Sequence, residues 1–176
     1  MVKTVILRFR DLVTPPGGAI KEHRRLIQRT GEAWWGWWMR PNEEAPRALF
    51  KELADNIEIH KPFTAYLLDS GSLQLYSVHL DRIAAAPPGS TIATPDPEKS
   101  PDYYHKGRYP IWFLLRSLNE VYIEDLRLLF DSVPTNPDLQ VGHLREAQIS
   151  SLEQLRTLDV TLWVAQYEPN TGFSSS

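Results

Sequence analysis

The sequence contains no cysteine, which excludes disulfide bonds, thiol catalysis and cysteine-ligated zinc. It also contains no apolar run near the roughly 20 residues that a membrane-spanning helix needs. Its first residues, MVKTVILRFRDL, hold no long apolar stretch of the kind found in signal peptides. We therefore expect no membrane partner and a cytoplasmic location. The net charge of −3 gives no overall basic field for holding a long nucleic acid, although a local basic groove is compatible with it.

The common catalytic signatures are missing as well. The chain has no G-x-x-x-x-G-K-[ST], G-x-G-x-x-G, H-E-x-x-H or G-x-S-x-G motif. Its five histidines are scattered, and no two of them lie at the spacing of metal ligands. We therefore predict a protein that is not an enzyme and that holds neither a metal ion nor a cofactor.

Hydrophobic periodicity predicts an α+β fold. The length suits one domain, which we place at residues 1–167, followed by a tail or linker at 168–176. Strands are predicted at 3–9, 63–69, 72–83, 111–118 and 159–167, and helices at 19–30, 45–57, 123–133 and 150–158. The pair at 63–83 reads as a hairpin with a β-bulge near Leu75. This order favours a curved mixed sheet or small barrel with helices packed against it.

The most specific feature is GEAWWGWW at 31–38, which places four tryptophans within five positions. If this segment is extended, its side chains alternate between two faces. We expect Trp35 and Trp37 to face the core beside the first helix. Trp34 and Trp38 would then share a side with Gly36, where the missing side chain leaves room for a ligand. A flat aromatic wall suits a nucleobase, whose stacking contributes about 1–3 kcal/mol. The alternative is that all four rings only complete the core.

Basic residues flank these aromatic residues. Arg8 and Arg10 share one face of the first strand, and Arg24 and Arg40 lie on either side of the tryptophan segment. The arginine guanidinium matches phosphate geometry, so these side chains are candidate phosphate contacts. The alternative is a solvated surface. His23, between apolar positions of the first helix, is either a core histidine or a donor at the floor of a cleft.

A second aromatic group lies in PDYYHKGRYPIWF at 101–113, at the end of a long proline-rich loop. Tyr103, Tyr104 and Trp112 are its candidate ligand contacts, because long loops that carry aromatic and cationic side chains are typical of binding lids. The alternative is an exposed connector whose aromatic side chains pack down onto the protein.

These elements together resemble the PUA-like superfamily. The resemblance consists of a first strand ending in arginine, a helix, the tryptophan segment, the hairpin AYLLDSGSLQLYSVHLDRI and the strand YPIWFLL. Its EVE, ASCH and YTH branches are the most similar. The stretch AIKEHRRLIQRTGEAWWGWW is also similar to N-terminal sensor-like domains that precede effector enzymes in bacterial defence-type proteins. The resemblance implies a compact β-barrel with packed helices and an aromatic-walled pocket that reads a nucleobase, often a modified one.

The sequence leaves three hypotheses about function. The main hypothesis is a non-enzymatic sensor of a free nucleotide, or of one modified base flipped out of DNA or RNA, with a downstream effector domain or partner protein. The second is a regulatory, protein-binding domain without a nucleotide ligand. The third is a nucleic-acid hydrolase, for which His105, Lys106, Asp69 and Asp81 are candidate residues at no fixed spacing.

Overall fold

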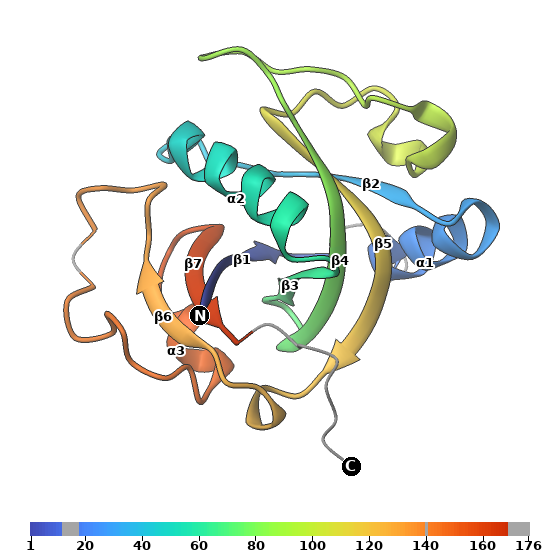
Figure 1. The fold of residues 1–176 in the computed structure, drawn as a ribbon. Coiled ribbons are helices and arrows are strands. Elements are labelled where there is room, and N and C mark those ends of the chain that lie inside the picture. Colours follow the sequence, from blue (N-terminus) through green and yellow to red (C-terminus); the bar gives the residue numbers. More distant parts are fainter. Residues whose placement is uncertain (12–17, 140, 169–176) are drawn as a thin grey trace.

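The computed structural model describes residues 1–11, 18–139 and 141–168, which form a strongly curved seven-stranded mixed sheet with helices packed on it (Figure 1). The strands follow one another across the sheet in the order β2-β5-β4-β3-β1-β7-β6. Their bounds are β1 Val2–Phe9, β2 Ala33–Gly36, β3 Phe63–Asp69, β4 Gln74–Ala85, β5 Ile111–Val121, β6 Leu129–Ser132 and β7 Leu162–Tyr167. β1 pairs in parallel with β3, and the other neighbouring strands pair antiparallel.

The helices confirm most of the expectations from periodicity. They are α1 Gly18–Thr30, α2 Arg47–Ile59 and α3 Leu152–Arg156. α1 buries Ile20, His23 and Leu26 toward β2 and β5 and ends at Gly31, whose φ of +88° is a conformation that glycine adopts without strain. Ser151 caps α3 by accepting a hydrogen bond from Glu153 N. In the described part of the chain, no helix is long and apolar enough to cross a membrane.

The α+β class is confirmed, but the sheet is not a closed barrel. β2 and β6, each four residues long, form its two edges, and no ladder joins them among the described residues. On the edge of β2 that faces away from β5, side chains bond to the backbone carbonyl groups that a further strand would otherwise pair with. His23 bonds to the carbonyl oxygen of Trp34, and the hydroxyl of Tyr104 donates to that of Gly36. Because these groups occupy the edge, a further strand is not needed to satisfy it.

Two local predictions are wrong. The segment predicted as a helix at 123–133 consists of the 3-10 helix η3, Ile123–Asp125, followed by β6. β6 is extended because it pairs with β7, and burial alternates along Leu128–Asp131 as a result. The bulge expected near Leu75 is absent there. The irregularities of the β4–β5 ladder lie instead on either side of Leu80, and both faces of β4 are covered at Leu75.

The sheet carries two separate apolar clusters. The main core contains the buried face of α2 and the rings of Trp35, Trp37 and Trp163. A second cluster, formed by Trp34, Tyr104, Trp112 and Leu114, lies at the β2–β5 end of the sheet. The segment 86–110, with its 3-10 helices η1 Pro97–Lys99 and η2 Asp102–Tyr104, covers this second cluster. The tryptophan segment therefore lies between two differently built regions.

A candidate ligand pocket beside the tryptophan strand

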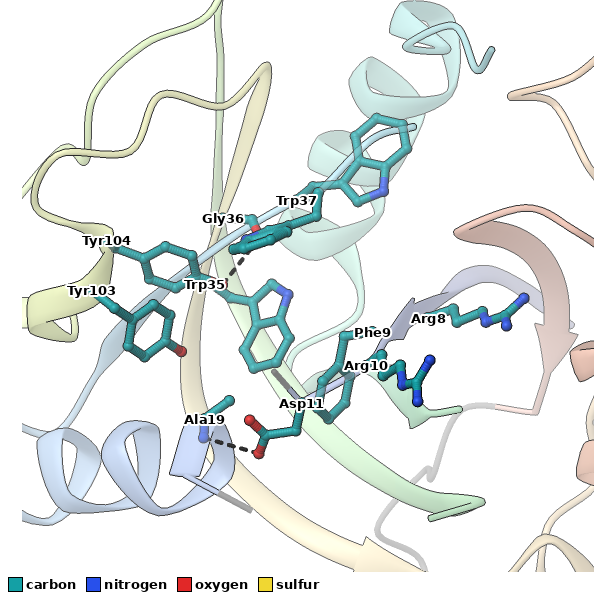
Figure 2. A pocket seen from close by; sticks show the side chains of 11 residues that line it. Arg8, Phe9, Arg10, Asp11, Ala19, Trp35, Gly36, Trp37, Tyr103 and Tyr104 are labelled. Carbon is teal, nitrogen blue, oxygen red and sulfur yellow. Dashed lines mark hydrogen bonds between the residues drawn. The ribbon is translucent and has the colours of Figure 1, made fainter. Parts of the chain in front are cut away.

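A pocket of about 70 Å³ opens beside β2, between the end of β1, the start of α1 and η2 (Figure 2). It is lined by Arg8, Phe9, Arg10, Asp11, Ala19, Trp35, Gly36, Trp37, Trp38, Tyr103 and Tyr104. A cavity of about 150 Å³ holds a benzene molecule. The space beside β2 therefore accepts part of a flat ring and leaves the remainder in its open mouth.

The walls of the pocket are aromatic, and Trp35 stands at their centre (Figure 2). Phe9 meets the Trp35 ring edge-on, with 5.0 Å between centroids and an angle of 76° between planes. Tyr103 and Tyr104 lie against each other at 4.5 Å on another side of the pocket. These rings expose apolar surface that prefers a flat, weakly hydrated partner. The structure thus gathers Trp35, Trp37, Trp38, Tyr103 and Tyr104, all five of which the sequence singled out.

His23 supports the pocket from behind. It is completely buried, with its ring 4.6 Å from that of Trp35. Its Nδ1 lies 2.7 Å from the carbonyl oxygen of Ala19, and its Nε2 lies 3.0 Å from that of Trp34. Burial lowers the pKa of His23 to about 4, although both carbonyl contacts act in the opposite direction. The imidazole is therefore neutral at pH 7 and donates to one of the two carbonyls at a time. This is the core histidine of the two alternatives, and it joins α1 to β2.

The expected use of Gly36 is wrong. A Cβ atom at this position would lie 2.6 Å from Cδ2 of Tyr109, so the Tyr109 ring fills the space that we expected a ligand to take. Trp34, on the same face, is buried in the second cluster and is not among the pocket residues. The guanidinium of Arg82 lies 5.9 Å from the Trp34 ring centre. The pocket lies instead on the side of Trp35.

Trp38 and Trp112 have different environments. Trp38 is 53% exposed, stacks on Tyr109 at 5.8 Å and borders the pocket. Trp112 is completely buried in the second cluster, where its Nε1 donates to the carbonyl oxygen of Ile92 at 3.0 Å. Trp112 therefore supports the covering segment and does not contact the pocket.

Positive charge gathers at one end of the pocket. Arg8 and Arg10 both line it, and Figure 2 shows their guanidinium groups beyond the aromatic rings. Arg8 Nη1 donates to the carbonyl oxygen of Leu158 at 3.1 Å. Burial, followed by the charges of Arg40 and other nearby arginines, lowers the pKa of Arg8. Arg40 does not line the pocket but pairs with Asp159, next to the residue that Arg8 contacts. An anion arriving here would relieve the repulsion between these like charges.

A buried carboxylate fixes the wall beside this cluster. Glu43, only 4% exposed, accepts hydrogen bonds from the hydroxyl of Thr161 at 2.6 Å and from its backbone N at 3.0 Å. The same hydroxyl accepts from Trp37 Nε1 at 3.1 Å. Glu43 thus holds Trp37 and the start of β7 in place. Sequence reasoning missed it, because nothing in the local pattern marks a glutamate in a polar loop as buried.

Three lining residues, Phe9, Asp11 and Ala19, were also missed. Phe9 follows Arg8 on β1 and belongs to the strand predicted at 3–9, but it was not singled out as a ligand contact. Asp11 accepts a hydrogen bond from Ala19 N at 3.1 Å through Oδ2, at the start of α1, where the helix dipole favours a negative charge. The run Phe9-Arg10-Asp11 at the end of a predicted strand is the sequence signal that could have indicated these contacts.

The remaining candidates lie elsewhere. Arg24 donates to the carbonyl oxygen of Leu118 and lies over the ring of Tyr76, outside the pocket. Asp69, Asp81 and His105 each bond to a different part of the chain. Asp69 accepts from Gly71 N in the β3–β4 turn, Asp81 pairs with Arg116, and His105 Nε2 lies against backbone carbonyls of its own loop. No contact between these candidates occurs in the described residues.

Comparison with known proteins identifies a matching family. The model of a family described as Pua-like matches residues 5–171, which is nearly the whole chain. No curated protein and no solved structure matches. Within the ranges that the structure describes, no group of three or more His, Cys, Asp or Glu side chains could hold a metal ion.

Proposed function

The chain belongs to the Pua-like family, and from this premise we propose that it recognises a nucleobase without acting as an enzyme. Pua-like domains typically bind RNA or nucleobases and are generally non-catalytic. The base would come either as a free nucleotide or as one modified base flipped out of DNA or RNA. The observation that carries this proposal is the pocket beside Trp35, which combines aromatic walls with arginines at one end.

The base would lie against the aromatic walls. Trp35 is held rigidly by Phe9 and His23, so its ring is already in place before a ligand arrives. Trp38 at the mouth could cover the part of the ring that the cavity does not enclose. Stacking tolerates any base and contributes about 1–3 kcal/mol. The aromatic contacts would therefore supply affinity more than they distinguish one base from another.

The phosphate of the ligand would lie at Arg8 and Arg10. These two side chains project from one end of the pocket, as a base-bound phosphate requires. The overall charge of −3 favours one extruded or free nucleotide over a long strand tracking the surface. We further propose that binding is reported to a downstream effector domain or partner protein.

Intrinsic tryptophan fluorescence tests this proposal. The purified chain is titrated with unmodified and base-modified nucleosides, with their 5′-monophosphates and with short single-stranded oligonucleotides. We expect quenching by at least one of these probes, because Trp35, Trp37 and Trp38 line the pocket. No quenching and no thermal shift with any probe would contradict the proposal.

A matched pair of arginine variants locates the phosphate. Arg10→Gln should weaken binding of a monophosphate several-fold and leave binding of the matching nucleoside unchanged, since only the phosphate loses a partner. Arg29→Gln, on the exposed side of α1, should alter neither. Equal losses for nucleoside and monophosphate would place the phosphate elsewhere.

A second candidate function is a protein-binding domain. The observation that favours it is the half-exposed ring of Trp38, since exposed aromatic side chains are common at interfaces. A flat apolar patch would support this function, whereas the pocket is concave and carries Arg8 and Arg10. The first proposal therefore has the stronger support.

A further inference from the structure

One polar group in the pocket has no partner. The hydroxyl of Tyr103 is buried and makes no hydrogen bond with any described residue. Two other buried side-chain atoms share this condition, Thr135 Oγ1 and Trp163 Nε1, and neither of these residues lines the pocket. Buried polar groups are normally hydrogen-bonded, so an orphaned hydroxyl at a ligand pocket indicates a partner that arrives with the ligand.

The neighbouring tyrosine shows the contrast. Tyr104 lies 4.5 Å from Tyr103 between ring centres, and its hydroxyl donates to the carbonyl oxygen of Gly36 at 3.2 Å. Tyr104 thus holds β2 through this bond, whereas the Tyr103 hydroxyl, although close to that of Tyr104, makes no well-aligned hydrogen bond with any described residue. Figure 2 shows that hydroxyl on the edge of the ring that faces Trp35 and Asp11. Because Trp35 and Asp11 both line the pocket, the oxygen lies on the pocket side of the Tyr103 ring.

The protonation state fixes what this hydroxyl can do. Burial raises the pKa of Tyr103. The nearby Tyr104 hydroxyl acts against this rise, and the charge of Asp11 adds to it. The phenol therefore keeps its proton at neutral pH. It can donate a hydrogen bond, and a neighbouring carboxylate favours a partner that is neutral over one that is anionic.

We propose that the Tyr103 hydroxyl is a specificity-determining donor, which binds an acceptor atom on the buried edge of the base. That acceptor is a ring nitrogen or a carbonyl oxygen, so the ligand is a heteroaromatic ring and not a purely hydrocarbon one. This inference rests on the proposed function. Stacking would bind any base, and the Tyr103 hydroxyl would then favour bases that carry an acceptor atom at this edge.

The proposal predicts effects of opposite sign from one substitution. Tyr103→Phe removes an oxygen that has no partner in the free protein, so the melting temperature should rise by about 2–4 °C. The same substitution removes the donor that the ligand needs, so affinity should fall about 5- to 10-fold. A Tyr103 that only packs would give the rise in melting temperature without the loss of affinity.

Thr135→Val is the matched control. It removes another orphaned, completely buried hydroxyl, outside the pocket. It should raise the melting temperature in the same way and leave ligand affinity unchanged. The comparison separates the effect of an unsatisfied hydroxyl on stability from the effect of this hydroxyl on binding.

The experiment uses the full chain, with AMP, GMP, CMP, UMP, N6-methyl-AMP and 5-methyl-CMP as probes. Affinity is measured by fluorescence titration for the wild type and for both variants. The probe that binds best is then compared with an analogue in which one ring nitrogen is replaced by C–H or one carbonyl is removed. The analogue that lacks the acceptor should lose 5- to 10-fold with the wild type and nothing further with Tyr103→Phe.

The outcomes separate the two proposals. Binding by the wild type that Tyr103→Phe leaves unchanged overturns the role of this hydroxyl and leaves the proposed function standing. A melting temperature lowered by Tyr103→Phe also overturns it, because the hydroxyl would then have a partner in the free protein. Failure of the wild type to bind any of the probes overturns the proposed function, and this inference with it.

Discussion

The two sides of β2 use the same residue type for different purposes. On one side, Trp34 and Trp112 are sealed under the segment 86–110, and Tyr109 fills the space above Gly36. On the other side, Trp35 forms the wall of an open pocket that also contains arginine and aspartate side chains. Adjacent residues of one short strand thus belong to a closed cluster and to an open site.

This difference teaches that aromatic residues alone do not mark a ligand site. Both sides of β2 are rich in rings, and Trp35 is buried almost as fully as Trp34. What separates them is access for a ligand, together with polar groups that remain beside the rings. Charged side chains that line the open space itself, here Arg8 at the end of β1 and Arg10 just after it, are the better guide to which face is functional.

The largest effect on stability should come from the closed side. Trp112→Ala removes a completely buried ring together with its hydrogen bond to Ile92, which should lower the free energy of unfolding by about 3–5 kcal/mol. Trp38→Ala, which truncates a half-exposed ring, should lower it by about 1–2 kcal/mol. Thermal and urea denaturation measure both variants. Equal losses would mean that the second cluster is not the sealed unit that we describe.

A smaller effect should follow from acidification. The pKa of His23 is about 4 in the folded protein and near 6.5 in the unfolded chain, so the unfolded state binds more protons between these values. The contribution of neutral His23 to the free energy of unfolding is therefore complete above about pH 6.5. It falls by about 3 kcal/mol as the pH drops toward 4. Denaturation at a series of pH values should show this loss in the wild type and a flatter profile in His23→Gln. Parallel profiles would assign the pH dependence to other groups.

Histidine NMR gives an independent check on the same prediction. In the wild type, the ring signals of His23 should not titrate above about pH 5. This result does not depend on how stable the His23→Gln variant is. Titration near pH 6.5 would contradict the burial that we assign to this ring.

The next effect concerns the filled space at Gly36. Gly36→Ala would push a Cβ atom into the Tyr109 ring, and overpacking of this kind costs about 1–3 kcal/mol. Gly142→Ala is the control, because nothing lies within 4 Å of its added Cβ. A Gly36→Ala variant that keeps full stability but loses nucleotide binding would restore our first expectation, in which the ligand occupies this space.

Much of the fold was predictable because its signals are local. The alternation in β1 and the apolar face of α1 with Gly31 at its end follow from neighbouring residues. The extended form of the tryptophan segment was only a condition of the prediction, and the structure meets it over Ala33–Gly36. The strand β6 was not predictable, because Leu129–Ser132 becomes a strand only by pairing with β7, far along the chain. The β2 edge is satisfied by hydrogen bonds with His23 and Tyr104, and no local sequence pattern connects these residues to it.

The site was predictable in its components but not in its arrangement. Alternation correctly placed Trp35 and Trp37 together and Trp34 opposite them. Which of the two faces stays open depends on how the segment 86–110 folds over one of them, and on Tyr109 in particular. Asp11 and Glu43 were missed for the same reason, since their contacts with Ala19 and Thr161 are not local in sequence.

The central claim is that the Trp35 side of β2 is the ligand face and the Trp34 side is structural. The six indole N–H signals of the chain, observed by ¹H–¹⁵N NMR during titration with the best-binding nucleotide, test it most directly. We predict shifts confined to Trp35, Trp37 and Trp38, with the signals of Trp34, Trp112 and Trp163 unmoved. Shifts centred on Trp34 and Trp112, or no shift with any nucleotide, would contradict the account.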